Sequence, residues 1–305
     1  MRRSGFRLIF VFVGLGVAAS SPTLSVPQGE AWGQSHTLKL TSFAIPPGAP
    51  LGVLLKVRID NGPVLRLLLD SGAEFIVLDK NAAAKSGIAG DSEFELVGMG
   101  KSPRAARVAK AGTVTVGDLV FQNRRLIIAG GKVLDGVDGV IPLSLFAGFL
   151  MRLDLPGKTL ELRPYPPAGS VEVAHLSPVR AHNDLLFIKG VLNDSREGYV
   201  LLDTGASFNV ISESTARALK YPSLFASSVR LQGGAGAIEG SMYFTEVRFR
   251  FGSRVVSANP VMVVGLHQFE QYNQIEVAGI LGYPALRESI LTINYRDALV
   301  GIERK

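Results

Sequence analysis

The sequence contains no cysteine, and this absence excludes several kinds of site. A chain without thiols has no disulfide, no thiolate metal ligand, no cysteine nucleophile and no lipid-modified cysteine. The four histidines are scattered, and no two have the spacing that places two metal ligands on one helix face: His36, His175, His182 and His267. A Gly-x-Ser-x-Gly motif is also absent, so zinc-dependent and serine hydrolase chemistry have little support.

Long runs of basic residues are also absent. The formal net charge is +6, but Arg2, Arg3 and Arg7 lie in the first few residues, and +3 remains without them. No lysine and arginine block follows, so we expect no nucleic-acid partner.

The amino terminus has the three-part pattern of a secretory signal peptide. Residues 1–7 are basic, residues 8–19 are apolar without a charge, and small residues follow at 18–21. An uncleaved membrane anchor is the alternative, but the apolar segment is short for a span, which needs about 20 residues. We therefore expect export to the periplasm or the extracellular space, with no stable membrane span after signal cleavage.

The 305 residues suffice for two domains, and 47% hydrophobic against 19% charged residues predicts a packed globular chain. Short apolar runs separated by turn residues indicate strands, with little room for helices. Residues 94–116 and 237–251 are expected to form long hairpins. We expect a signal peptide at 1–21, a flexible lead-in at 22–37, lobes at 38–163 and 173–305, and a linker at 164–172.

One short motif occurs twice. Residues 67–73 read Leu-Leu-Leu-Asp-Ser-Gly-Ala, and residues 200–206, 133 positions further on, read Val-Leu-Leu-Asp-Thr-Gly-Ala. The following apolar positions also match, with Phe75 opposite Phe208. A single Asp-Ser-Gly is commonly a local turn, in which the Asp side chain bonds the nearby backbone. Two copies with matching flanks indicate a duplicated unit in which a buried strand delivers a carboxylate to a tight turn.

Two lobes related by approximate twofold symmetry would bring Asp70 and Asp203 together at their interface. Two carboxylates in contact cannot both ionise cheaply, so they share a proton. One can then take a proton from water while the other protonates a carbonyl oxygen, which permits water to attack an amide without a covalent intermediate or a metal. We expect no cofactor and no metal.

The neighbouring residue types suit this task. Gly72 and Gly205 leave backbone N–H groups available to the carboxylates. The hydroxyl groups of Ser71 and Thr204 can form hydrogen bonds across the interface. Two alanines keep the junction small enough for close approach, and they are Ala73 and Ala206.

Asp70-Ser71-Gly72-Ala73 and Asp203-Thr204-Gly205-Ala206 resemble the active-site motifs of aspartic proteases of the retropepsin/pepsin clan. The resemblance extends from about residue 38 to the end. The chain is similar to bacterial exported members of this clan that carry two retropepsin-like units in tandem. It implies an all-β fold with two pseudo-symmetric acid-protease-like β lobes and an active-site cleft between them. It further implies that Asp70 and Asp203 are the catalytic dyad of an aspartic endopeptidase acting on peptides or proteins.

Some positions depart from the family pattern. The apolar-apolar-Gly segment of the family is present at 280–282. Its counterpart in the first half ends in Pro142 instead of glycine, so we expect the packing behind Asp70 to differ from the family pattern. The first hairpin, around 101–110, is basic and lacks a flap tyrosine. The second contains the glycine-rich segment 233–236, and Tyr243 near it is expected to be a packing residue.

Two alternatives remain open on the sequence. A protease fold can hold peptides or glycans without cutting them, because function depends on the site rather than on the fold. Each lobe can also pair with a lobe of another chain, although we expect a two-lobed monomer rather than an obligate dimer. Substrate-binding residues are not identified by any motif.

Overall fold

The computed structural model describes residues 9–10, 33–44, 51–96, 104–170, 176–220, 226–233, 236–243 and 246–305. For residues 9–10, 94–96, 104, 226–233 and 236–243 it describes the backbone alone. The expected signal peptide, apart from residues 9 and 10, and most of the lead-in lie outside the described residues. The structure is mostly strands, 53% of it, as the sequence predicts.

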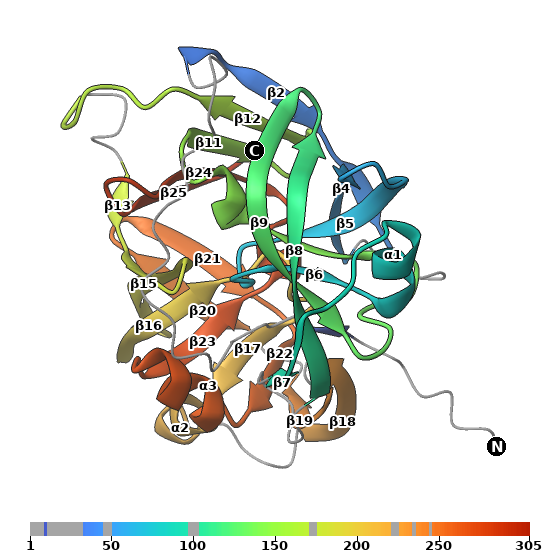
Figure 1. The fold of residues 1–305 in the computed structure, drawn as a ribbon. Helices are drawn as coiled ribbons and strands as arrows, with labels where there is room; N and C mark the ends of the chain where they lie inside the picture. The colour runs from blue at the N-terminus through green and yellow to red at the C-terminus, as the bar shows by residue number, and fades with distance from the viewer. Residues whose placement is uncertain are drawn as a thin grey trace.

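The first lobe is a sheet that closes on itself (Figure 1). Its strands lie in the order β3 (Thr41–Phe43), β4 (Gly52–Ile59), β5 (Val64–Asp70), β10 (Gly139–Pro142), β6 (Ile76–Leu78), β9 (Leu119–Ala129), β8 (Arg104–Val116) and β7 (Ser92–Leu96). An additional pairing of β4 with β8 closes the barrel, with Arg58 opposite Thr115.

The second lobe is a barrel-like sheet. Its strands lie in the order β1 (Ile9–Phe10), β18 (Ala226–Gly233), β19 (Gly236–Tyr243), β22 (Val261–Val264), β17 (Asn209–Ser212), β23 (Val277–Leu281), β16 (Arg196–Leu202), β15 (Leu185–Leu192), β20 (Val247–Phe251) and β21 (Arg254–Ala258), and β14 (Arg180–His182) pairs with β15. β1 runs parallel to the end of β18, with Ile9 opposite Gln232.

The two lobes repeat one topology around the duplicated motif. β5 runs parallel to β10, and β16 runs parallel to β23, so each motif strand lies beside the segment expected behind it. β6 likewise runs parallel to β9, as β17 does to β22. The internal repeat in the sequence therefore corresponds to repeated strand pairing.

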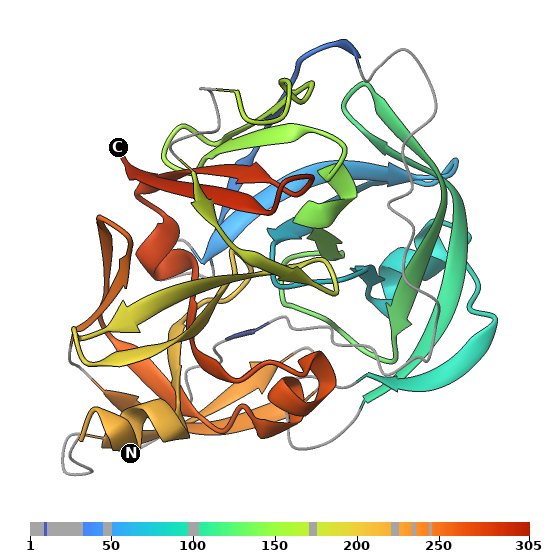
Figure 2. The same cartoon turned by 90° about the vertical axis from the view of Figure 1, so that its left-hand side faces the viewer.

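A third sheet joins the lobes (Figure 2). Its order is β13 (Ser177–Pro178), β25 (Leu299–Arg304), β24 (Ser289–Asn294), β11 (Leu150–Asp154), β12 (Thr159–Arg163) and β2 (His36–Lys39). Its central pair takes one strand from each half, with Met151 of β11 opposite Ile293 of β24. The pairing is antiparallel, and the buried Leu153 and Leu291 lie directly opposite one another. Backbone hydrogen bonds and core packing therefore fix the two halves beneath their junction.

The helices are short: α1 (Lys80–Lys85), the 3-10 helix η2 (Leu143–Phe146), α2 (Glu213–Ala218), α3 (His267–Asn273) and α4 (Tyr283–Leu286). α1 and α2 follow the two motifs at equivalent positions and begin with side-chain caps, in which Asp79 accepts from the Ala82 N–H and Ser212 from the Thr215 N–H. In the described part of the chain, no helix has the length and apolar character needed to cross a bilayer.

The first expected hairpin is present, because β7 pairs antiparallel with β8, with Leu96 opposite Arg104. Residues 104–116 form one strand, β8, because Ala109, Ala111 and Val114 keep facing the core along its length. The chain turns only at Gly117, whose φ is +62°. The second expected hairpin differs from the prediction. In the second lobe, the glycine-rich segment joins β18 to β19, whereas residues 247–251 form β20 and belong to the next hairpin, β20–β21.

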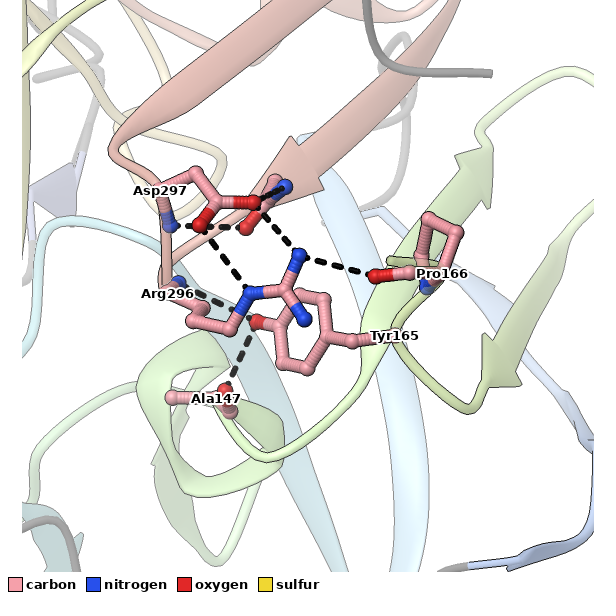
Figure 3. Close-up of polar contacts among 6 residues, drawn as sticks. Ala147, Tyr165, Pro166, Arg296 and Asp297 are labelled. Atoms are coloured by element: carbon pink, nitrogen blue, oxygen red, sulfur yellow. Dashed lines mark hydrogen bonds and ion pairs between the residues drawn. The ribbon is translucent and has the colours of Figure 1, made fainter. Parts of the chain in front are cut away.

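The segment between the lobes contacts both of them (Figure 3). The Tyr165 hydroxyl donates to the Ala147 carbonyl at 2.8 Å, and it accepts from the Arg296 N–H at 3.3 Å. The Arg296 guanidinium lies 4.6 Å from the centre of the Tyr165 ring and donates to the Pro166 carbonyl at 2.9 Å. Asp297 pairs with the same guanidinium. This part of the expected linker is therefore fixed to η2 on one side and to the β24–β25 turn on the other.

Candidate active site

The two motif aspartates lie at the ends of buried strands. Asp70 is the last residue of β5 and is opposite Pro142 of β10. Asp203 follows β16 directly, and its N–H donates to the Leu281 carbonyl of β23 at 3.0 Å. Both side chains are fully buried, because the apolar residues before each motif form the lobe cores.

Each motif glycine lies against the aspartate of the other lobe. A Cβ atom on Gly205 would be 2.2 Å from Cγ of Asp70, and one on Gly72 would be 2.6 Å from Cγ of Asp203. Neither distance is possible for a real side chain, so glycine is required at both positions. The structure thus brings the two sequence-predicted aspartates together from opposite lobes.

Four hydrogen bonds cross the junction through the two hydroxyl residues. Thr204 Oγ1 donates to the Leu69 carbonyl at 2.9 Å and accepts from the Ser71 N–H at 3.1 Å. Reciprocally, Ser71 Oγ donates to the Leu202 carbonyl at 2.8 Å and accepts from the Thr204 N–H at 3.0 Å. All of these groups are buried, so each bond is formed in a site from which water is largely excluded.

One oxygen of each carboxyl group is held by the backbone. Asp70 Oδ1 accepts from the Gly72 N–H at 2.7 Å, and Asp203 Oδ1 accepts from the Gly205 and Ala206 N–H groups, both at 2.9 Å. The Oδ2 atoms are buried, and neither accepts a hydrogen bond from a protein donor in the described ranges. Each aspartate therefore has one fixed oxygen and one oxygen available to share a proton or bind a reacting group.

Burial raises the pKa of both carboxyl groups. The pKa of Asp70 is well above the usual value because of burial and, next, because of the neighbouring charge of Asp203. Burial raises the pKa of Asp203 to about 6, against the opposing effect of its contact with Asp70 and of the backbone N–H groups that bind its Oδ1 atom. The two carboxyl groups therefore share one proton over a range of pH.

The two alanines complete the close approach. Ala73 and Ala206 are buried, and each packs in a small apolar cluster of its own lobe. The Ala206 carbonyl also accepts from the Tyr283 N–H at 2.8 Å, which ties the second motif to α4.

Pro142 does not leave an unsatisfied group behind Asp70. In the second half the Gly282 N–H donates to Asn209 Oδ1 at 3.1 Å. In the first half proline has no N–H to satisfy, and the position equivalent to Asn209 is the apolar Ile76. The first half therefore lacks both the N–H donor and the side-chain acceptor of this hydrogen bond. The segments that end in Pro142 and Gly282 still lie beside their motif strands.

Glu74 and Tyr272 are polar residues near the motif that the sequence analysis missed. The Tyr272 hydroxyl of α3 donates to Glu74 Oε2 at 3.1 Å, which adds another contact between the lobes. A charged residue directly after the motif, where the second copy has Ser207, was the available signal. The side chains of Tyr243 and of segment 233–236, and the first hairpin tip at 97–103, lie outside the described residues.

Two barrel-like lobes that each bring one buried aspartate to their junction define an aspartic protease of the two-lobed pepsin/retropepsin type. Residues 55–143 and 188–285, more than half of the chain, match the family described as Aspartyl protease. The chain belongs to this family. A search of curated proteins finds no significant match.

Among solved structures, the chain is similar to the aspartic proteinase from Irpex lacteus. The TM-score is 0.58 at 12% sequence identity, and the match covers 89% of this chain and 98% of that one. At this identity the likeness establishes the fold alone.

Proposed function

We propose that this protein is an aspartic endopeptidase that hydrolyses peptide bonds with Asp70 and Asp203 as its catalytic residues. The observation that supports this most directly is the pair of buried carboxyl groups, each with a glycine of the other lobe against it and each with one unpartnered oxygen. A structural role alone would not require two adjacent buried acids that each keep one oxygen without a hydrogen-bond donor among the described residues, because burial of such an atom is costly.

In the proposed reaction, the ionised Asp203 accepts a proton from water as the water oxygen bonds to the carbonyl carbon of the substrate. Asp70 gives its proton to the carbonyl oxygen, which produces a neutral tetrahedral diol. The C–N bond then breaks, the leaving nitrogen takes the proton from Asp203, and a diol hydroxyl returns a proton to Asp70. The products are a carboxylic acid and an amine, and the protonation state of the pair is restored.

Cleavage of a mixed peptide library across pH 4–9 by the purified protein tests the proposal. Asp70→Asn and Asp203→Asn keep the side-chain shape and remove the acid–base function, so each should reduce the rate by about 10³-fold. Glu197→Gln, at an exposed position, is the matched control and should cleave like the wild type.

Because the pair needs one proton, cleavage should decrease as the pH falls below about 6, where Asp203 becomes protonated. No cleavage at any pH, together with peptide binding that both variants retain, would instead identify a binding protein on a protease fold. Equal cleavage by wild type and variants would assign catalysis to other residues.

We also propose that the protein is exported and acts as one chain with both half-sites. The basic and then apolar residues 1–19 support export, and the hydrogen bonds between Ser71 and Thr204 support a site completed within the chain. Sequencing the amino terminus of secreted material and sedimentation of the purified protein test these two statements. Absence of the protein from the periplasmic and extracellular fractions would contradict the first, and an obligate dimer the second.

A further inference from the structure

The contact between Glu74 and Tyr272 links the lobes outside the repeated motifs. Glu74 lies in the loop after the first motif, and Tyr272 lies in α3 of the second lobe, 198 positions away. Neither residue has a counterpart that would form the symmetric contact, because Ser207 occupies the position equivalent to Glu74. The contact is therefore an addition to the pseudo-twofold arrangement.

Few neighbouring groups stabilise a negative charge on the Glu74 carboxyl group. Its Oε1 atom is buried and accepts no hydrogen bond within the described residues. Its Oε2 atom has the Tyr272 hydroxyl as its partner. No lysine, arginine or histidine in the described ranges forms an ion pair with it. Burial of a carboxylate with so few partners favours its neutral form.

The groups around Glu74 reinforce this preference. Asp184, at the tip of the β14–β15 turn, adds a second carboxyl group whose charge opposes ionisation of Glu74. Tyr295 of the β24–β25 turn donates its hydroxyl to the Asp184 carbonyl at 3.2 Å, so it does not compensate the Asp184 carboxylate. The bases on β14, Arg180 and His182, form no ion pair with either acid in the described part of the chain.

The same turn also contacts α3. Asn183 Nδ2 donates to Asn273 Oδ1 at 3.3 Å, and Asn273 Nδ2 donates to the Phe269 carbonyl at 3.0 Å. α3 is a short helix without a side-chain cap. Its last two residues are thus held by Glu74 of the first lobe and Asn183 of its own lobe.

We propose that Glu74 is a positioning residue, which holds α3 against the first lobe through Tyr272 while its carboxyl group is protonated. When it ionises, the cost of a buried charge, for which the described residues provide no countercharge, outweighs this hydrogen bond, so the Glu74 side chain leaves the position for solvent and the contact breaks. The proposal depends on the fold and not on proteolysis, so it extends beyond the proposed function. Burial raises the pKa of Glu74 to about 8, opposed by the Tyr272 hydrogen bond and assisted by Asp184. The contact should therefore respond to pH above neutrality.

The sign of the effect on stability follows from this pKa. In the unfolded chain a glutamate titrates near pH 4.3. Because the folded pKa is higher, the stabilising contribution is fully present below that pH and is lost as the pH rises through about 8. Glu74→Gln keeps an oxygen acceptor for Tyr272 and cannot ionise, so it should not show this loss.

Thermal unfolding of the full chain from pH 4 to 9.5 tests the stability effect. The melting temperature of Glu74→Gln minus that of the wild type should increase by about 3 °C or more over this range. Glu197→Gln, an exposed glutamate, should give a difference that is constant with pH. Taking differences between chains removes the contribution of the Asp70–Asp203 pair, which both contain.

Hydrogen exchange of α3 provides a second readout that does not require activity. Protection of residues 267–273 in the wild type should decrease above about pH 8, after correction for the intrinsic exchange rate. Glu74→Gln should keep its protection. Because Tyr272→Phe removes the hydroxyl that binds Glu74, it should lower the protection of residues 267–273 at every pH and abolish the change above about pH 8.

An inactive chain that still shows the stability and exchange effects would contradict the proposed function and leave this inference intact. The inference is overturned if Glu74→Gln retains the pH dependence of the wild type in unfolding and exchange.

Discussion

The two half-sites are alike where they meet and differ where they face their own lobes. Each contributes an aspartate, a hydroxyl residue whose bonds cross the junction, and a glycine against the opposite carboxyl group. Behind the motifs, however, Pro142 and Ile76 stand where the second half has Gly282 and Asn209. Contacts made between the halves must match in shape and in hydrogen bonding, whereas a pair inside one half can be exchanged for another satisfied pair.

The largest expected effect comes from filling the close approach of the glycines. Gly205→Ala places a methyl group 2.2 Å from Cγ of Asp70, and Gly72→Ala places one 2.6 Å from Cγ of Asp203. We expect each to destabilise the chain by about 3 kcal/mol and to reduce cleavage by about 100-fold, with Gly205→Ala the more severe. Urea unfolding and peptide cleavage measure the two effects.

Gly33→Ala is the control, because a Cβ at Gly33 has no neighbour within 4 Å. It should unfold and cleave like the wild type. A Gly205→Ala chain as stable as this control would show that the two loops do not approach in solution as they do in the structure.

The sequence predicted that the two aspartates lie close together, but it did not predict the detailed contacts around them. The internal repeat predicts the two aspartates, the matching topology of the lobes and the equivalent positions of α1 and α2, because equivalent sequences form equivalent local structure. The contact of Glu74 with the second lobe could not be predicted. Its partner lies on α3, a short helix without a side-chain cap and without a counterpart in the first half, and the sequence of so short a helix has no strong helical pattern. The extent of β8 and the compensation of Pro142 by Ile76 required strand register, which long-range pairing determines.

Removal of the hydroxyl groups tests whether the halves contribute equally. Thr204→Val removes the donor to the Leu69 carbonyl and leaves the buried Ser71 N–H without an acceptor. Ser71→Ala removes the reciprocal pair. We expect each substitution to cost about 2 kcal/mol, since each leaves buried backbone groups unsatisfied.

The free energy of unfolding in urea is the measurement. Ser71→Thr and Thr204→Ser preserve the hydroxyl oxygens and serve as controls, with changes of about 0.5 kcal/mol. Costs for Thr204→Val and Ser71→Ala that differ by more than about 1 kcal/mol would show that one lobe dominates the junction.

The smallest expected effect concerns the charge of the pair. Burial raises the pKa of Asp203 to about 6, above the value of about 3.9 for an unfolded chain. The stabilising contribution of its proton is therefore complete below pH 4 and is lost as the pH rises through 6.

Asp203→Asn cannot ionise, so relative to the wild type it should gain about 1 kcal/mol of stability between pH 4 and pH 7, since coupling to Asp70 reduces the full effect of the shift. Urea unfolding at these two pH values measures the gain, and the exposed control Glu197→Gln should show none. A relative loss of stability in Asp203→Asn as the pH rises would mean that the ionised carboxylate is better compensated in the folded chain than its buried position indicates.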